Sequence, residues 1–191
     1  MSCFSEQTKR AADLLKEGKV CVLPTDTLYG LCGSAAFSET VEKVYQLKRR
    51  DLKKPMIVLI GRLKDLKLFA VKLNRETKKI LKKFWPGEVS VILPCYSERF
   101  SYLHRGMNSL AFRLPGPTWL RKLLKKTGPL VAPSCNPEGL RPAQTIAEAR
   151  QYFKDDVAFY LDKGTLSGLP STLIEIENGK AVVKRKGRFQ I

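Results

Sequence analysis

In KVCVLPTDTLYGL (residues 19–31), a short apolar run leads directly into a loop of small polar side chains. Residues 19–24 have the length and composition of a buried strand, and the Pro, Thr, Asp and Gly that follow are typical of a loop. Ligand sites in α/β proteins gather where strands end in polar loops. The segment LPTDTLYGL (residues 23–31) is therefore a candidate site, although residues 24–27 could equally well be an ordinary capped turn.

Outward from this segment, helical and strand patterns alternate along the chain without repeats or an interdomain linker. Apolar periodicity predicts a helix over residues 6–18, with Ser5 as N-cap and Gly18 as its stop. The same reasoning predicts further helices at 38–47, 75–84, 117–126 and 145–152, and further strands at 56–60, 89–94, 110–114, 129–133 and 157–161. We expect one domain over residues 1–191, of the α/β (α+β) class, in which helices cover a mixed sheet.

The C-terminal region predicts a β-hairpin. Asn178-Gly179 separates STLIEIE from KAVVKRK, and both residues tolerate the positive φ angles of a type I′ turn. Counting back from this turn sets Thr172 opposite Arg185. Because Pro170 disfavours regular pairing, we expect Ser171 to lie in the loop before the strand.

Composition indicates a globular protein. The chain has 191 residues, 43% of them hydrophobic, and 35 Lys or Arg against 18 Asp or Glu give a net charge of +17. Apolar runs such as residues 89–94 fall far short of the roughly 20 residues that a spanning helix needs. The N-terminal residues show no secretory signal, so we expect a cytoplasmic protein with no membrane association.

Cysteine and histidine usage argues against a metal centre. The five cysteines are odd in number and never form a CxxC pair, so we expect reduced, mostly buried thiols. The single histidine, His104, excludes a multi-His site, and its apparent loop predicts a solvated side chain. No GxxxxGK[ST] or GxGxxG motif is present, so a nucleotide would have to be held by other loops.

Positive charge is concentrated in residues 48–126, which contain 21 Lys or Arg and five Asp or Glu, a net charge of +16. Such a field attracts polyanions. For the four lysines of NRETKKILKKFW (residues 74–85) we favour an outward, solvated helix face, because Ile80, Leu81 and Phe84 share the opposite face.

Two further segments carry ligand-binding residue types. LKRRDLKKP (residues 47–55) places Lys48, Arg50 and Lys54 in a loop, where a guanidinium fork and compact ammonium groups can grip a triphosphate. VAPSCNPEGLRPAQT (residues 131–145) offers Ser134 and Asn136 as uncharged hydrogen-bonding groups. Either segment alone is also consistent with a solvated loop.

Together with FWPGEVSVILP (84–94), LAFRLP (110–115), LPSTLIEI (169–176) and VVKRKG (182–187), these segments resemble the YrdC-like threonylcarbamoyl-AMP synthases in order and spacing. The resemblance covers roughly residues 8–188. It implies a twisted mixed sheet around a basic central cavity. It also implies a reaction in which L-threonine, bicarbonate and ATP give threonylcarbamoyl-AMP and pyrophosphate, and transfer of the intermediate to partner proteins that modify tRNA.

The resemblance also implies roles for individual residues. The family's KxR and SxN tetrad, which contacts ATP and stabilises transition-state charge, falls on Lys48, Arg50, Ser134 and Asn136. The family's threonine-binding positions fall on Thr27, Arg113 and Ser171. Its nucleotide contact near the C-terminus falls on Arg185.

The sequence departs from the family pattern at several positions, among them Cys135, Glu138 and Asp51. Since the sequence offers no obvious metal carboxylate beyond Asp26, we expect Mg²⁺ to accompany ATP through phosphates and waters.

Two other readings remain open. One is a factor that binds double-stranded RNA or tRNA by contacting the RNA backbone. We expect any such binding here to be weak. The other is a carbamoyltransferase-like domain.

Overall fold

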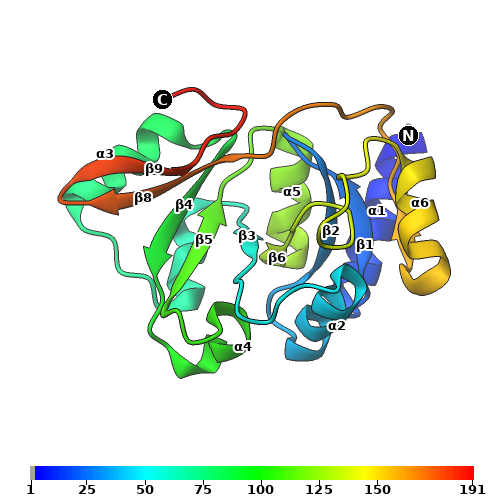
Figure 1. The fold of residues 1–191 in the computed structure, drawn as a ribbon, viewed down its shortest axis with the longest axis horizontal. Coiled ribbons are helices and arrows are strands. Elements are labelled where there is room, and N and C mark those ends of the chain that lie inside the picture. The colour runs from blue at the N-terminus through cyan, green and yellow to red at the C-terminus, as the bar shows by residue number, and fades with distance from the viewer. Residues whose placement is uncertain (1–2) are drawn as a thin grey trace.

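The computed structural model describes residues 3–191, and within them nine strands form one mixed sheet in the order β7-β1-β2-β6-β3-β5-β4-β8-β9 (Figure 1). The strands are β1 (Cys21–Pro24), β2 (Tyr29–Ser34), β3 (Ile57–Leu59), β4 (Val89–Pro94), β5 (Ser109–Arg113), β6 (Leu130–Val131), β7 (Phe159–Tyr160), β8 (Thr172–Glu177) and β9 (Lys180–Arg185). The α-helices are α1 (Cys3–Lys16), α2 (Ser38–Lys48), α3 (Arg75–Phe84), α4 (Ser101–His104), α5 (Thr118–Thr127) and α6 (Ile146–Phe153). Short 3₁₀ helices cover Leu63–Phe69, Glu98–Phe100 and Lys154–Asp156. This architecture confirms the predicted mixed sheet with covering helices.

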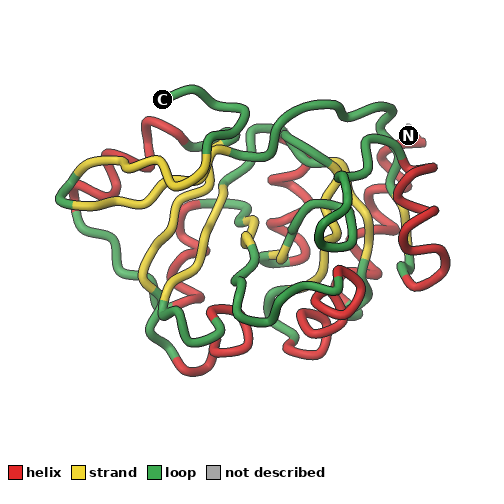
Figure 2. The backbone as a smooth tube through the Cα atoms, in the orientation of Figure 1, coloured by secondary structure: helices red, strands yellow, loops and turns green. Residues whose placement is uncertain are grey.

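Parallel and antiparallel pairs coexist in the sheet. Strands β1 and β2 form an antiparallel hairpin, whereas β3–β5 and β4–β8 are parallel pairs. The chain between β7 and β8 crosses the molecule as one long loop (Figure 2). The loop begins at β7, on one edge of the sheet, and ends at β8, which lies beside β4 in the other half. It therefore brings residues from the two halves together.

The core forms on both faces of the sheet because strand side chains alternate in direction. Cys21 and Leu23 pack with Leu15 of α1 and Leu120 of α5 on one face. Val22 belongs to the cluster on the other face, which includes residues of α2 and α6.

Several element boundaries differ from the sequence prediction. Helix α1 already includes Cys3, so Ser5 lies within the helix and is not its N-cap. Gly18 does follow the helix end, with φ of 76°. Strand β2 was not predicted, because Gly30 and Gly33 weaken its strand pattern. The predicted strands at 129–133 and 157–161 shorten to two residues each.

The environment of His104 contradicts its predicted solvated position. The side chain is 1% exposed, and its Nδ1 accepts a hydrogen bond from the Gly106 amide at 3.2 Å. The segment forms a one-turn helix, α4, whose last side chain turns inward. The cysteine prediction is confirmed: all five are free thiols, and four of them are buried. Within residues 3–191, none of the helices combines the length and apolarity needed to cross a bilayer.

The C-terminal hairpin confirms the predicted turn and corrects the register. Glu177 pairs with Lys180 as expected, but a bulge between Leu173 and Ile174 sets Leu173, not Thr172, opposite Arg185. Strand β8 begins at Thr172, so Ser171 lies in the preceding loop as predicted.

Candidate functional site

Loops from both halves of the sheet line a partly open cavity of about 180 Å³. The β1–β2 turn, strands β3 and β5, the segment after β6 and the segment before β8 form its wall. Six of the nine residues predicted to bind substrate or nucleotide line this wall: Thr27, Arg50, Arg113, Ser134, Ser171 and Arg185. The other three, Lys48, Lys54 and Asn136, are not part of the lining.

The β1–β2 turn is both a capped turn and part of the cavity wall. The Thr25 hydroxyl donates to the Leu28 carbonyl at 2.7 Å and accepts from the Thr27 amide at 3.2 Å. The Thr25 and Thr27 hydroxyl oxygens lie 3.2 Å apart, and Thr27 lines the cavity. The two readings of this segment are therefore compatible, because the turn orients the Thr27 hydroxyl.

Arg113, at the end of β5, is a buried cation that forms an ion pair with one carboxylate, Asp26, within residues 3–191. Its Nη2 lies 3.3 Å from Asp26 Oδ1, and both side chains are about 95% buried. Burial lowers the pKa of Arg113 from its ordinary value, while the charge of Asp26 opposes that effect. Among residues 3–191, the Arg113 Nε has no hydrogen-bond partner. The guanidinium therefore keeps one unused donor, which is buried, while the residue itself lines the cavity.

Ser171 and Arg185 are in direct contact. Arg185 Nη2 donates to the Ser171 carbonyl at 2.9 Å, and the Ser171 hydroxyl lies 2.9 Å from that of Ser90 on β4. The Arg188 amide donates to the Pro170 carbonyl at 2.9 Å, which holds the C-terminal segment against this loop.

Three guanidinium groups share the cavity. Desolvation lowers the pKa of Arg185, and the charges of Arg113 and Arg50 lower it further. Because all three arginines line one cavity, their charges repel one another, and a bound anion would relieve this repulsion.

Lys48 lies behind the cavity wall and holds the segment after β6. Its Nζ donates to the Ser134 carbonyl at 2.5 Å and to the Asn136 carbonyl at 2.6 Å. The Ser134 hydroxyl in turn donates to Asn136 Oδ1 at 2.7 Å. Burial lowers the pKa of Lys48 to about 8. Lys48 and Asn136 therefore do not line the cavity themselves, but they hold Ser134, which does.

The loop after α2 presents Arg50 to the cavity but not Lys54. Arg50 donates through Nε to the Lys54 carbonyl at 3.1 Å and through Nη2 to the Pro55 carbonyl at 3.2 Å. The Lys54 ammonium is exposed and donates to Glu138 Oε1 at 2.7 Å. As the loop stands, Lys54 is paired with a carboxylate and is not directed into the cavity.

Sequence reasoning missed three contributors: Asp26 as the partner of Arg113, Ser90 beneath Ser171, and Glu138 beside Lys54. Ser90 had one sequence signal, since it is the single polar residue within the apolar run of β4. The partners of Asp26 and Glu138 lie more than 80 residues away from them, and no local pattern identifies such contacts.

No cluster of three or more His, Cys, Asp or Glu able to hold a metal occurs among the described residues. Asp26, the carboxylate closest in sequence to the cavity-lining Thr27, is already paired with Arg113. The residues present therefore suit a Mg²⁺ ion carried by phosphates and waters better than one held by protein ligands.

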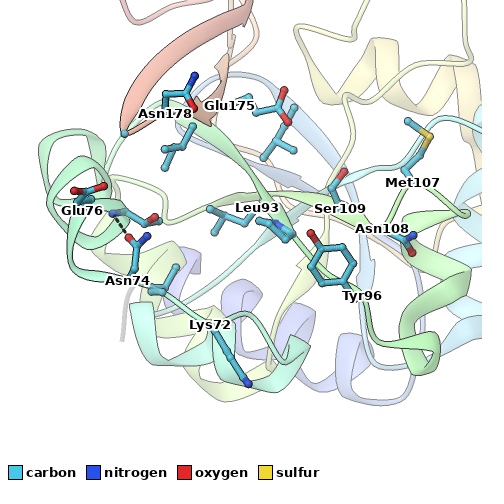
Figure 3. Close-up of a pocket in the computed structure, with 16 residues that line it drawn as sticks. Lys72, Asn74, Glu76, Leu93, Tyr96, Met107, Asn108, Ser109, Glu175 and Asn178 are labelled. Carbon is cyan, nitrogen blue, oxygen red and sulfur yellow. Dashed lines mark hydrogen bonds between the residues drawn. The ribbon is translucent and has the colours of Figure 1, made fainter.

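A larger groove of about 780 Å³ lies near the tip of the β8–β9 hairpin, and it contains none of the predicted site residues. Figure 3 shows its polar side chains, among them Asn74, Tyr96, Asn108 and Asn178. The Asn74 side chain accepts from the Thr77 amide at 2.7 Å and so caps its own helix, α3. The arginines that could bind an anionic substrate are at the smaller cavity, which is therefore the candidate site.

Comparison with known proteins gives a consistent result. The family model Sua5/YciO/YrdC, described as telomere recombination, matches residues 13–187. The threonylcarbamoyl-AMP synthase of Bacillus subtilis is 33% identical over 98% of this chain, and that of Pyrococcus abyssi is 30% identical over 93%. The alignments cover 55% and 53% of those relatives, so the chain spans about half of their length. For the threonylcarbamoyl-AMP synthase of Hahella chejuensis, the identity is 30% and the coverage is 90% of this chain and 94% of the relative.

Solved structures share the fold of this chain. Sua5 of P. abyssi complexed with L-threonine superposes with a TM-score of 0.86 at 28% identity, covering 94% of this chain and 54% of that one. Escherichia coli YciO superposes with a TM-score of 0.84 at 20% identity, covering 95% of this chain and 89% of that one.

Proposed function

This chain belongs to the Sua5/YciO/YrdC family, and from that premise we propose that it is a threonylcarbamoyl-AMP synthase, which forms threonylcarbamoyl-AMP and pyrophosphate from L-threonine, bicarbonate and ATP. The observation that carries the proposal is the gathering of six predicted site residues, from distant parts of the sequence, around one cavity. The curated relatives of the same name and the threonine complex of P. abyssi Sua5 support it.

The size of the cavity suits the amino acid. At about 180 Å³ it is smaller than the roughly 300–1,000 Å³ typical of pockets for drug-sized ligands. In our proposal the Arg113 guanidinium binds the threonine carboxylate, and the Thr27 and Ser171 hydroxyls orient the remaining polar groups. The nucleotide then extends outward along Ser134 and Arg185.

The chemistry needs charge neutralisation and positioning more than acid–base groups. The threonine amine attacks the carbon of bicarbonate, and loss of water leaves a carbamate. A carbamate oxygen attacks the α-phosphorus of ATP, and the bond to pyrophosphate breaks. Every reactant except the amine is an anion, so fixed cations favour both binding and the transition state.

In this scheme the tetrad residues have different tasks. Arg50 lines the cavity and neutralises phosphate charge, with Arg185 facing it from the hairpin. Ser134 hydrogen-bonds the nucleotide, while Lys48 and Asn136 hold Ser134 in place. Mg²⁺ enters with ATP, bound by phosphates and waters.

We further propose that the protein works in the cytoplasm and passes its product to proteins that place the threonylcarbamoyl group on tRNA. Its charge of +17 favours weak association with tRNA, which would bring the product close to its destination.

Pyrophosphate release from ATP tests the proposed function. We expect release to require both L-threonine and bicarbonate. L-Serine should support less turnover, because losing one methyl group from a fitted pocket costs about 1–3 kcal/mol. Equal release without any amino acid would refute the proposal. Dependence on carbamoyl phosphate would instead favour a carbamoyltransferase, and dependence on RNA would favour an RNA-binding factor.

A further inference from the structure

Two loops form one rim beside the cavity, and each holds the other. The first, residues 48–54, begins at Lys48, the last residue of α2, and presents Arg50. The second, residues 134–140, follows β6 and presents Ser134. Lys48 connects the first loop to the second through the two carbonyl contacts described above. Glu138 makes the connection in the opposite direction.

Glu138 contacts the first loop at three points. Its amide donates to the Lys48 carbonyl at 2.6 Å. Its Oε2 accepts from the Asp51 amide at 2.8 Å, and its Oε1 accepts from the Lys54 ammonium at 2.7 Å. The Lys54 hydrogen bond, followed by that of the Asp51 amide, lowers the pKa of Glu138, so the carboxylate is charged at neutral pH.

Apart from Glu138, the turn at Asp51–Lys54 is held by two hydrogen bonds of its own and by contacts to the Lys54 carbonyl. All four of its residues are exposed. Inside the turn, the Lys54 amide donates to the Asp51 carbonyl at 3.0 Å and the Lys53 amide donates to Asp51 Oδ1 at 2.9 Å. From outside it, the Tyr45 hydroxyl donates to the Lys54 carbonyl at 3.0 Å. Arg50 uses that same Lys54 carbonyl, together with the Pro55 carbonyl, to hold its guanidinium. The orientation of Arg50 therefore depends on where the turn is held.

A carboxylate at this rim is electrostatically unfavourable for a protein that binds ATP, because it repels phosphate and occupies the Lys54 ammonium. The hydrogen bond from the Asp51 amide gives Glu138 a structural role that an uncharged acceptor could also fill.

We propose that Glu138 is a positioning residue, which fixes the Asp51–Lys54 turn and through it the direction of Arg50 toward the nucleotide. The effect on catalysis rests on the proposed function, whereas the effect on the turn does not. Loss of the negative charge alone should raise the affinity for ATP, because the carboxylate repels phosphate. Loss of the contact with the turn should lower it, because Arg50 is then no longer held. The two effects can therefore be separated.

The experiment compares Glu138→Ala and Glu138→Gln with the control Glu148→Ala. Glutamine keeps an acceptor for the Asp51 amide but loses the charge. Glu148 makes the same pair of contacts elsewhere, with Arg141 Nη2 at 2.7 Å and the Gln144 amide at 2.7 Å. It therefore controls for the general cost of losing a surface carboxylate with one cation and one amide partner.

We expect Glu138→Ala to raise the KM for ATP five- to tenfold and to leave the KM for threonine within twofold. Glu138→Gln, which loses only the charge, should leave the KM for ATP unchanged or lower, and Glu148→Ala should change neither KM. In the protein without nucleotide, hydrogen exchange of the amides at residues 51–54 should be at least tenfold faster in Glu138→Ala and unchanged in Glu148→Ala.

Three results would overturn the inference: a lower KM for ATP in Glu138→Ala, an equal rise in Glu148→Ala, or unchanged exchange at residues 51–54 in Glu138→Ala. If the wild type makes no threonylcarbamoyl-AMP, the proposed function fails. The exchange measurement then decides by itself whether Glu138 fixes the turn.

Discussion

Replacing Lys48, a residue that is 2% exposed, with Met removes its ammonium group and keeps much of the side-chain volume. The Ser134 carbonyl retains a second donor, the Asn136 amide at 3.0 Å. The Asn136 carbonyl loses its Lys48 partner at 2.6 Å, and an unpaired buried carbonyl costs about 1–3 kcal/mol. Against this, burial lowers the pKa of Lys48 from 10.5 to about 8, which corresponds to a penalty of roughly 3 kcal/mol for the charged form. At pH 7 the variant should therefore unfold with a free energy within about 2 kcal/mol of the wild type.

The same pKa shift predicts how this difference changes with pH. Between pH 8 and pH 10.5 the unfolded wild type binds a proton that the folded protein has lost. Stability from this group therefore rises with pH, by roughly 2.5 kcal/mol between pH 7 and pH 10. Lys48→Met has no such group. The difference in unfolding free energy between the two proteins should move by that amount in favour of the wild type.

Urea unfolding at pH 7 and pH 10 measures the effect, with Lys79→Met on the exposed face of α3 as the control. The control should show no pH-dependent difference from the wild type, since Lys79 is solvated. Turnover of Lys48→Met should fall more than tenfold at pH 7, because Ser134 is no longer held. If the difference in unfolding free energy between Lys48→Met and the wild type is the same at both pH values, the reasoning about burial is wrong. Full activity of the variant would refute the role in holding Ser134.

Arg50→Ala should lower turnover more than tenfold with little change in melting temperature, whereas Lys79→Ala should change neither; equal effects on activity would contradict the distinction between site and surface. Arg113→Ala leaves Asp26 buried without its cation and should lower the free energy of unfolding by about 3–5 kcal/mol in chemical denaturation, and adding Asp26→Asn should restore part of this loss without restoring activity. Any binding of tRNA should be weak and should fall steeply between 50 and 200 mM salt in a filter-binding titration, because affinity comes mainly from counterion release; a tight complex insensitive to salt would favour specific RNA recognition instead.

Local sequence information was sufficient wherever a short-range preference controls the structure. The solvated face of α3 follows from a 3.6-residue pattern, and the turn at Asn178-Gly179 follows from two residues that accept positive φ angles. It was insufficient for β2, whose two glycines carry no strand preference, and for His104, whose burial depends on how α4 packs. The order of the motifs identified the family and the candidate residues without locating any of them in space.

The sequence by itself determined the alternation of helices and strands, the C-terminal turn and the residue types available for binding anions. Only the tertiary structure decided which of these groups meet. Arg185 reaches Ser171 because a bulge shifts the hairpin register by one residue, and Glu138 reaches Lys54 because the segment after β6 lies beside the loop after α2. Contacts between residues so far apart in the chain depend on strand order and on packing of the whole core, which no local propensity encodes.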